Sequence, residues 1–343
     1  MVPLLCPSVP RPFALLVLLA GALLLPFAHG SDSEDAEDEK EPSLWVVEYE
    51  NDIFSGEDRY YTSGVRLTRI ADAREAPSWL ESVARRFPGF EDAHALPYGL
   101  SIGHNIYTPA DITDPEFPPD DRPYAGWLHV KFITGTKHED GADRVRVGLG
   151  IVGPWAFGEQ IQKGVHELID TDEPRGWDTQ IENEPTILLG YDRTRRLLHV
   201  GDRERWALDG NAQGGITLGN AHTHAYAGGF MRFGYNLADD FGPPRITPAA
   251  SGSGYFQADT RRGWYVYFGW EGRRVVRDLF LQGNTFGGTD GVTIRRNVAE
   301  YYGGIVYTHN RLRLAYTHVW RSREFRNQLT SHDYGAFSAS LWW

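Results

Sequence analysis

Four side chains that could take part in hydrolysis recur at helical spacing within the stretch Gly153–His166. They are Glu159, Gln162, Lys163 and His166. A short helix here would carry Gln162 and His166 on one face, one turn apart. A histidine held in this way is a candidate general base, because the ordinary pKa of histidine lies near neutral pH. The stretch alone leaves open the alternative that His166 is a solvated loop residue.

The segments on either side of this stretch must position it, and their pattern is alternation. In 144–152, apolar residues alternate with arginines and glycines, and 311–321 repeats the pattern. Such period-two segments are typical of strands with one apolar face. Twelve strands are expected, at about 44–52, 60–70, 98–107, 125–136, 143–152, 185–195, 205–218, 224–236, 263–283, 296–308, 311–323 and 332–343. The longest helix-period run outside the Gly153–His166 stretch, at 79–87, is too short to cover a sheet of that size.

Two folds would satisfy twelve alternating strands, a soluble β-sandwich or barrel and a transmembrane barrel. Aromatic residues are abundant, with 11 Trp, 17 Tyr and 17 Phe, as the interfacial girdles of a membrane barrel require. The polar face is strongly charged, which a packed soluble core would not accept without pairing. The sequence ends on Trp343, in phase with Leu341 and Phe337. We therefore predict an all-β fold, a 12-stranded antiparallel transmembrane β-barrel over 43–343, with a short helix in an extracellular loop.

The segment before the barrel is interpreted as a cleaved leader. Arg11 precedes an apolar run, and Ala28-His29-Gly30 resembles a signal-peptidase site, so 1–30 is predicted to be a secretory signal peptide. Its removal would take away the only cysteine, Cys6, and change the net charge from −12 to −13. Residues 31–42 form an acidic leader, expected to be disordered. Such an acidic chain is a poor candidate for binding nucleic acid.

An even number of strands with periplasmic termini fixes the sidedness. The connections expected outside are 52–60, 108–124, 153–184, 219–223, 284–295 and 324–331, whereas 72–97 and 237–262 would be periplasmic. Asn51 and Asp52 then reach the same end as Gln162 and His166. Thr62 also lies at this end, and we expect it to point into the barrel because Tyr61, Val65 and Leu67 alternate with it. The alternative is that the Asn-Asp pair simply ends a strand and starts a turn, which is its commonest use.

Several motifs in this order resemble the outer-membrane lipid A 3′-O-deacylase family. They are Glu50-Asn51-Asp52, Asp58-Arg59-Tyr60-Tyr61-Thr62-Ser63-Gly64, Asn105-Ile106-Tyr107-Thr108-Pro109, Asp121-Arg122-Pro123-Tyr124-Ala125-Gly126-Trp127, Val152-Gly153-Pro154 with Gln162 and His166, and Gly176-Trp177-Asp178 with Gln180-Ile181-Glu182-Asn183. The resemblance runs from about residue 44 to the C-terminus. It implies a twelve-stranded barrel in the outer membrane of a Gram-negative cell. A monomer is expected.

The same resemblance implies an activity, calcium-dependent hydrolysis of the 3′-O-linked acyl group of lipid A, with lipopolysaccharide of the outer leaflet as partner. By motif, Asn51, Asp52, Thr62 and His166 match the family's active-site positions, with Gln162 as a neighbour on the helix. His166 would activate water as general base. Calcium near Asp52 and Asn51 would stabilise the oxyanion.

One departure from the family pattern concerns the second outer loop. Family members can carry an active-site lysine there, but 108–119 contains no Lys or Arg, and the next basic residue is Arg122. How a lipid phosphate or sugar is gripped is therefore open. The alternative function is a non-catalytic barrel of the same fold, such as a small porin, in which His222 and His224 of a short outer connection could form a metal pair.

Overall fold

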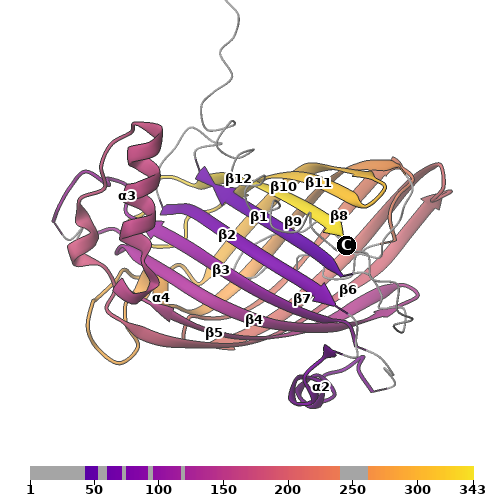
Figure 1. Cartoon of the computed structure of the whole chain (residues 1–343), viewed down its shortest axis with the longest axis horizontal. Coiled ribbons are helices and arrows are strands. Elements are labelled where there is room, and N and C mark those ends of the chain that lie inside the picture. The colour runs from indigo at the N-terminus through magenta and orange to yellow at the C-terminus, as the bar shows by residue number, and fades with distance from the viewer. Residues whose placement is uncertain (1–42, 53–59, 72–74, 92–95, 117–119, 240–261) are drawn as a thin grey trace, which may run out of the picture.

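The computed structural model describes residues 43–52, 60–71, 75–91, 96–116, 120–239 and 262–343, and these form a closed antiparallel barrel (Figure 1). Each strand pairs with its neighbours in the sequence, and β1 pairs with β12 to close the wall. The signal peptide and acidic leader predicted for 1–42 lie outside the described residues. Among the described residues, no helix is long and apolar enough to cross a membrane.

Most strand boundaries follow the alternation closely, but the strand predicted at 185–195 extends to Gly201. The strands are β1 Leu44–Asn51, β2 Tyr60–Ala71, β3 Tyr98–Thr108, β4 Ala125–His138, β5 Gly141–Val152, β6 Glu184–Gly201, β7 Trp206–Gly219, β8 His222–Tyr235, β9 Gly263–Asp278, β10 Asn297–His309, β11 Leu312–Arg321 and β12 His332–Trp342. The helices are α2 Ser78–Ala84, α3 Gly158–Ile169 and α4 Leu279–Gln282, with 3₁₀ turns η4 Pro154–Ala156 and η5 Gly176–Thr179. The twelve strands and the loop helix were thus predicted.

One predicted strand was too long. Strand 263–283 ends at Asp278, because the carboxylate of Asp278 accepts a hydrogen bond of 3.0 Å from the backbone N–H of Phe280 and starts α4. Asp278 is therefore an N-cap residue, which favours a helix over continued strand pairing. Leu279 and Phe280 of α4 are fully buried, so their apolar character fitted either element.

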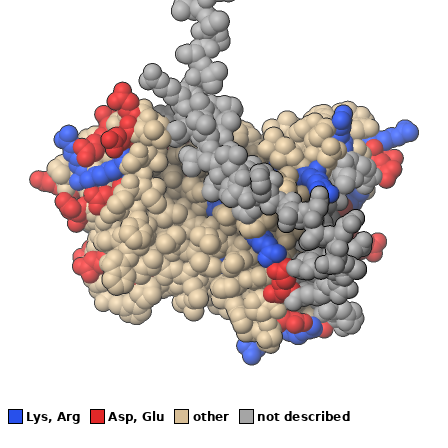
Figure 2. Space-filling view, viewed as in Figure 1, with Lys and Arg blue, Asp and Glu red and all other residues tan. Residues whose placement is uncertain are grey.

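The wall has the inverted pattern of a membrane barrel. Outward positions on the strands carry exposed apolar side chains, such as Ile102, Leu149 and Ile187, each more than half exposed. Figure 2 shows charged side chains gathered toward the two ends, with an uncharged expanse of wall between them. This distribution matches an apolar band that faces lipid.

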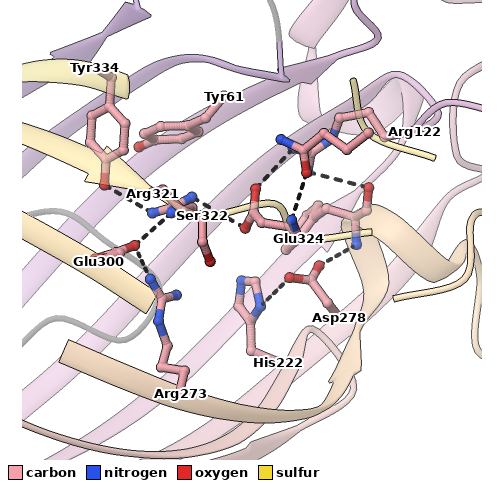
Figure 3. A network of polar contacts seen from close by, with 12 residues as sticks. Tyr61, Arg122, His222, Arg273, Asp278, Glu300, Arg321, Ser322, Glu324 and Tyr334 are labelled. Carbon is pink, nitrogen blue, oxygen red and sulfur yellow. Dashed lines mark hydrogen bonds and ion pairs between the residues drawn. The ribbon is translucent and has the colours of Figure 1, made fainter. Parts of the chain in front are cut away.

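The lumen is filled by paired charges rather than left open (Figure 3). Glu300 is 1% exposed and contacts both Arg273 and Arg321, the latter through Arg321 Nε at 2.6 Å. Arg66 and Glu48 form a two-bond ion pair with both distances at 2.6 Å. Buried charges are tolerated only when paired, and the alternating arginines of the sequence meet this condition across neighbouring strands.

Candidate active site on the outer wall

Helix α3 lies on the outside of the barrel, not over its mouth. Trp127 of β4 faces the lumen, where its ring lies 5.2 Å from that of Phe280. Gly126 precedes Trp127 and so faces outward, and a Cβ at Gly126 would come within 2.9 Å of the Gly158 Cα. The first turn of α3 therefore rests directly on β4, and only glycine at both positions allows this approach.

The chain before α3 is shaped by backbone that turns sharply. Gly153 has φ 97°, and Phe157, which precedes the helix, has φ 60°. His104, on the outer face of β3, donates from Nε2 to the carbonyl oxygen of Ala156 at 2.8 Å. This hydrogen bond is partly buried, and it holds the loop against the wall just before α3 begins.

Gln162 is held with a defined orientation. Its side chain is 2% exposed, and its Oε1 accepts a hydrogen bond of 2.8 Å from the indole Nε1 of Trp177 in η5. Since the indole can only donate, the amide nitrogen must point the other way. Among the described residues, Gln162 Nε2 has no hydrogen-bond partner. A buried amide donor is thus left without a protein partner, which is unusual because buried polar groups are generally hydrogen-bonded.

His166 is buried on the same face of α3, with 6% of its surface exposed. Its Nδ1 donates to the backbone carbonyl of Asp172 at 2.6 Å. The loop reaches this position because Asp170, in the left-handed region with φ 56°, ends the helix. A carbonyl only accepts, so Nδ1 carries the proton and Nε2 of the neutral ring is the basic nitrogen.

The two rim residues of β1 lie in register with the strands beneath α3. Asn51 pairs with Ser63 of β2, Ser63 with Ile106 of β3, and Ile106 with Gly126 of β4. Asn51 alternates with the lumen-facing Glu50, so it belongs to the outer face. Asp52 follows it at the strand end and is 1% exposed.

Thr62 does not point into the barrel, and that prediction was wrong. A β-bulge between Tyr61 and Ser63 makes Thr62 the extra residue of β2. Tyr61 instead occupies the lumen, where Asn105 donates to its hydroxyl at 2.8 Å. Thr62 Oγ1 lies 2.7 Å from Thr108 Oγ1, and Thr108 is the residue after the lumen-facing Tyr107. The bulge interrupts the alternation and turns Thr62 to the outer side, the side on which α3 lies.

The direction and length of α3 relate its buried face to the rim residues of β1 and β2. The helix contacts both β4 and β3, and Figure 1 shows it crossing the ends of the strands. From Gly158 to His166 is roughly 12 Å along the helix. Three strand spacings, from β4 to β1, amount to roughly 14 Å. A helix of this length that begins on Gly126 is long enough to span the distance from β4 to the rim that holds Asn51 and Thr62.

The chemistry of the rim residues suits a hard cation. The side chains of Asn51 and Asp52 offer an amide oxygen and a carboxylate, which are oxygen ligands of the kind calcium takes. Within the described part of the chain, no group of three or more His, Cys, Asp or Glu residues is placed to hold a metal. These residue types do not include asparagine, so that absence does not cover the pair Asn51 and Asp52. By the chemistry of their oxygen donors, these two residues fit calcium.

Arg122 does not replace the lysine that the second outer loop lacks. It is 2% exposed, and its Nη1 lies 3.8 Å from Glu324 Oε2 (Figure 3). Its guanidinium lies over the ring of Tyr107, 4.9 Å from the ring centroid. On the outer side, Lys163 of α3 is half-exposed and pairs with Glu159 at 2.8 Å. That hydrogen bond raises the pKa of Lys163, so this cation is permanently charged beside the site.

His222 and His224 belong to strand β8 rather than to an outer connection. Both are buried in the lumen with ring centroids 6.4 Å apart, and His222 Nδ1 lies 3.6 Å from Asp278 Oδ2. They line a small polar cavity together with Arg273 and Glu324. This cavity is separated from α3 by the barrel wall.

Three partners of the site were missed by reasoning from sequence. Trp177 was part of a quoted motif, but nothing in its spacing indicated that it orients Gln162. The Asp172 carbonyl is a backbone group, which sequence cannot signal. Thr108 ends a predicted strand, and its contact with Thr62 depends on the bulge.

Comparisons with known proteins agree with this architecture. The protein-family profile described as outer membrane protein LpxR matches residues 14–343. Among solved structures, LpxR from Salmonella typhimurium is similar with a TM-score of 0.71 and 19% identity, covering 88% of this chain and 100% of that one. The beta domain of the Bordetella autotransporter BrkA aligns with a TM-score of 0.42 and 12% identity, over 89% of this chain and 99% of that one. The comparison with curated proteins finds no match.

Proposed function

We propose that this chain, which belongs to the family of outer membrane protein LpxR and is an outer-membrane β-barrel, hydrolyses the 3′-O-linked acyl ester of lipid A. The observation that carries the proposal is the pair His166 and Gln162. Both are buried on one face of a helix that lies against the outer wall, where a lipid of the outer leaflet meets the protein.

In the proposed reaction, His166 acts as general base. Its Nδ1 is held by the Asp172 carbonyl, so Nε2 takes a proton from a water molecule as the water oxygen attacks the ester carbonyl. The tetrahedral oxyanion then collapses and breaks the bond to the sugar oxygen. That oxygen takes the proton back from the imidazolium, which leaves a free fatty acid and a sugar hydroxyl.

Gln162 is the proposed donor to the oxyanion. Trp177 fixes its oxygen, so the amide nitrogen is presented without rotating during the reaction. A donor that is already oriented stabilises the charge that develops, because no reorganisation is needed at that moment. Thr62, bonded to Thr108, would orient the substrate or a water at the rim.

Calcium is proposed as the cofactor, held by Asp52 and Asn51. When bound, it would supply a positive charge close to the ester carbonyl. Asp52 is almost fully buried, so its carboxylate is desolvated and suited to a strong bond with a hard cation.

A porin is the alternative that shares this fold. Conduction needs an open lumen, whereas in this one the ring of Phe280, from α4, stacks on that of Tyr107, from β3, with centroids 4.4 Å apart. This packing favours the enzyme over the porin.

Mass spectrometry of lipid A from cells that express the barrel tests the proposal. Wild-type protein should produce lipid A that lacks the acyl groups at the 3′ position, and His166→Ala at an equal level of folded barrel should not. Unmodified lipid A with abundant folded wild-type protein, assayed in detergent extracts with added calcium, would contradict it.

A further inference from the structure

The exposed side of α3 carries an unusual amount of apolar surface. Trp155 and Phe157, just before the helix, are 68% and 57% exposed. Ile161, Val165 and Leu168 within it are 43%, 37% and 65% exposed. We call these five residues the α3 stripe. Contiguous apolar patches on protein surfaces usually mark contact sites, and the reaction proposed above uses none of these side chains.

The stripe is a continuous row along the helix. Ile161, Val165 and Leu168 follow i, i+4, i+7 spacing, which keeps them on one face. Phe157 stands one turn before Ile161 and extends the row. Gly164 flanks it, and no atom lies within 4 Å of the position its Cβ would take. The row therefore presents only apolar or small groups to its surroundings.

The three faces of α3 have three different characters. At 100° per residue, Gln162 lies about a quarter turn from Ile161, and it faces the barrel wall. Lys163 lies nearly opposite the stripe, where it forms its ion pair with Glu159 at 2.8 Å. A helix that lies beside a barrel at the membrane surface has this arrangement when one face contacts the protein, a second faces lipid and a third faces water.

The position of α3 along the barrel agrees with this arrangement. The helix starts at Gly126, in the same cross-strand row as Ile106. Ile102, four residues further along β3, is 52% exposed on the outer face and belongs to the apolar band. The stripe thus begins roughly 13 Å or less from that band along the strands.

We infer that α3 is an interfacial helix whose stripe is inserted among the acyl chains of the outer leaflet. The occupant is lipid rather than another protein because the stripe continues the apolar band of the wall. Charged residues of α3 are confined to the side away from it. Insertion would fix the depth of His166 relative to lipid ester groups. That last consequence rests on the proposed function, whereas the insertion itself does not.

Site-directed spin labelling tests the insertion without any measurement of activity. Single cysteines at Ile161, Val165 and Leu168 would be labelled in the full-length chain carrying Cys6→Ser, reconstituted in phosphatidylcholine–phosphatidylglycerol vesicles. Labels at Lys163 and Glu167 serve as matched controls on the same helix. Oxygen concentrates in the acyl region and a water-soluble nickel chelate is excluded from it, so collision rates with the two report depth.

The expected result is a several-fold higher ratio of oxygen to nickel accessibility at the three stripe positions than at Lys163 and Glu167. Equal ratios would overturn the inference. Spin–spin broadening between labels at position 168 of two copies would overturn it in favour of a second copy as occupant, if the broadening persists when the protein is diluted with lipid. Folding is checked by heat-modifiable migration on gels.

A variant extends the test to catalysis. Leu168→Asp, at a side chain 65% exposed, should leave folding intact but bring a label at Val165 closer to water. If the chain is an esterase, this variant should hydrolyse lipid A in vesicles at least about tenfold more slowly than the parent does. It should hydrolyse detergent-dispersed lipid A at the parent rate. Loss of depth without any esterase activity in the parent would sustain the insertion and reject the function. An unchanged depth in Leu168→Asp would reject the insertion.

Discussion

The indole Nε1 of Trp177 donates to Gln162 Oε1 at 2.8 Å, and this bond fixes the orientation of the buried amide. Trp177→Phe would keep an aromatic ring beside Tyr124 but remove the donor. We expect kcat for deacylation to fall about tenfold, since a lost neutral hydrogen bond of ~1–1.5 kcal/mol changes a rate by roughly that factor. Gln162→Ala should lose more, about 10²–10³-fold, if the amide binds the oxyanion. Equal activity of Gln162→Ala and the parent would remove Gln162 from the mechanism.

His166 should tolerate no neutral replacement that lacks a basic nitrogen. We expect His166→Ala and His166→Asn to reduce deacylation at least about 10²-fold, while the barrel stays folded because the imidazole lies on the loop helix α3 and not in a strand of the wall. The measurement is the fraction of 3′-deacylated lipid A at matched amounts of heat-modifiable protein. Product at the parent level from His166→Ala would leave the reaction without its base.

Calcium dependence is a separate prediction. Excess chelator should abolish hydrolysis by the purified barrel, and added calcium should restore it, because the metal charge is proposed to act on the ester carbonyl. Asp52→Ala should lose about 10²-fold or more, whereas Asp111→Ala, in the second outer loop, serves as the acidic control and should keep activity. Undiminished turnover in chelator would exclude the metal.

The sidedness of the barrel can be measured directly. A cysteine at Asp172, exposed in the α3 loop, should react with an impermeant maleimide added to intact cells. A cysteine at Glu204, exposed in the turn between β6 and β7, should not react until the outer membrane is opened. The opposite pattern would place α3 in the periplasm, where lipid A of the outer leaflet is out of reach.

The lumenal charges predict a large effect on stability. Glu300→Ala would leave Arg273 and Arg321 buried without their shared carboxylate, at a cost of about 3–5 kcal/mol. Glu81→Ala, which removes an exposed partner of Arg85, should cost less than about 1 kcal/mol. Urea unfolding in detergent micelles, followed by heat-modifiable migration, would compare the two. Similar midpoints would mean that water, not pairing, satisfies the lumen.

Most of the wall was predictable because a membrane barrel imposes a strict period of two. An outward residue must be apolar and an inward one is usually polar, so the arginines that alternate with apolar residues in β5 and β11 identify both segments as strands. The site was less predictable. The face of Thr62 depended on one extra residue in β2, and the end of β9 on a cap at Asp278. Neither departs from ordinary strand composition.

The helix illustrates the same limit from another side. The spacing of Gln162 and His166 predicted a shared face, and the structure has both buried on α3. What orients them comes from further along the chain, from Trp177 and from the backbone of Asp172. Contacts that depend on the path of a loop produce no periodic pattern in the sequence. Reasoning from sequence therefore identified Gln162 and His166 but not the groups that orient them.

The pairing of β1 with β12 has a consequence for how the wall is made. Leu44 lies in register opposite Trp342, and Ser43 exchanges backbone hydrogen bonds with Trp343. The two strands that form this seam are separated by all ten others, so β1 has no lasting partner on that side until β12 arrives. In a bilayer an unpaired strand edge is costly. The β1–β12 seam is therefore the pairing that removes the last open edges of the wall, and a chain that lost either strand would expose unpaired backbone on two edges at once.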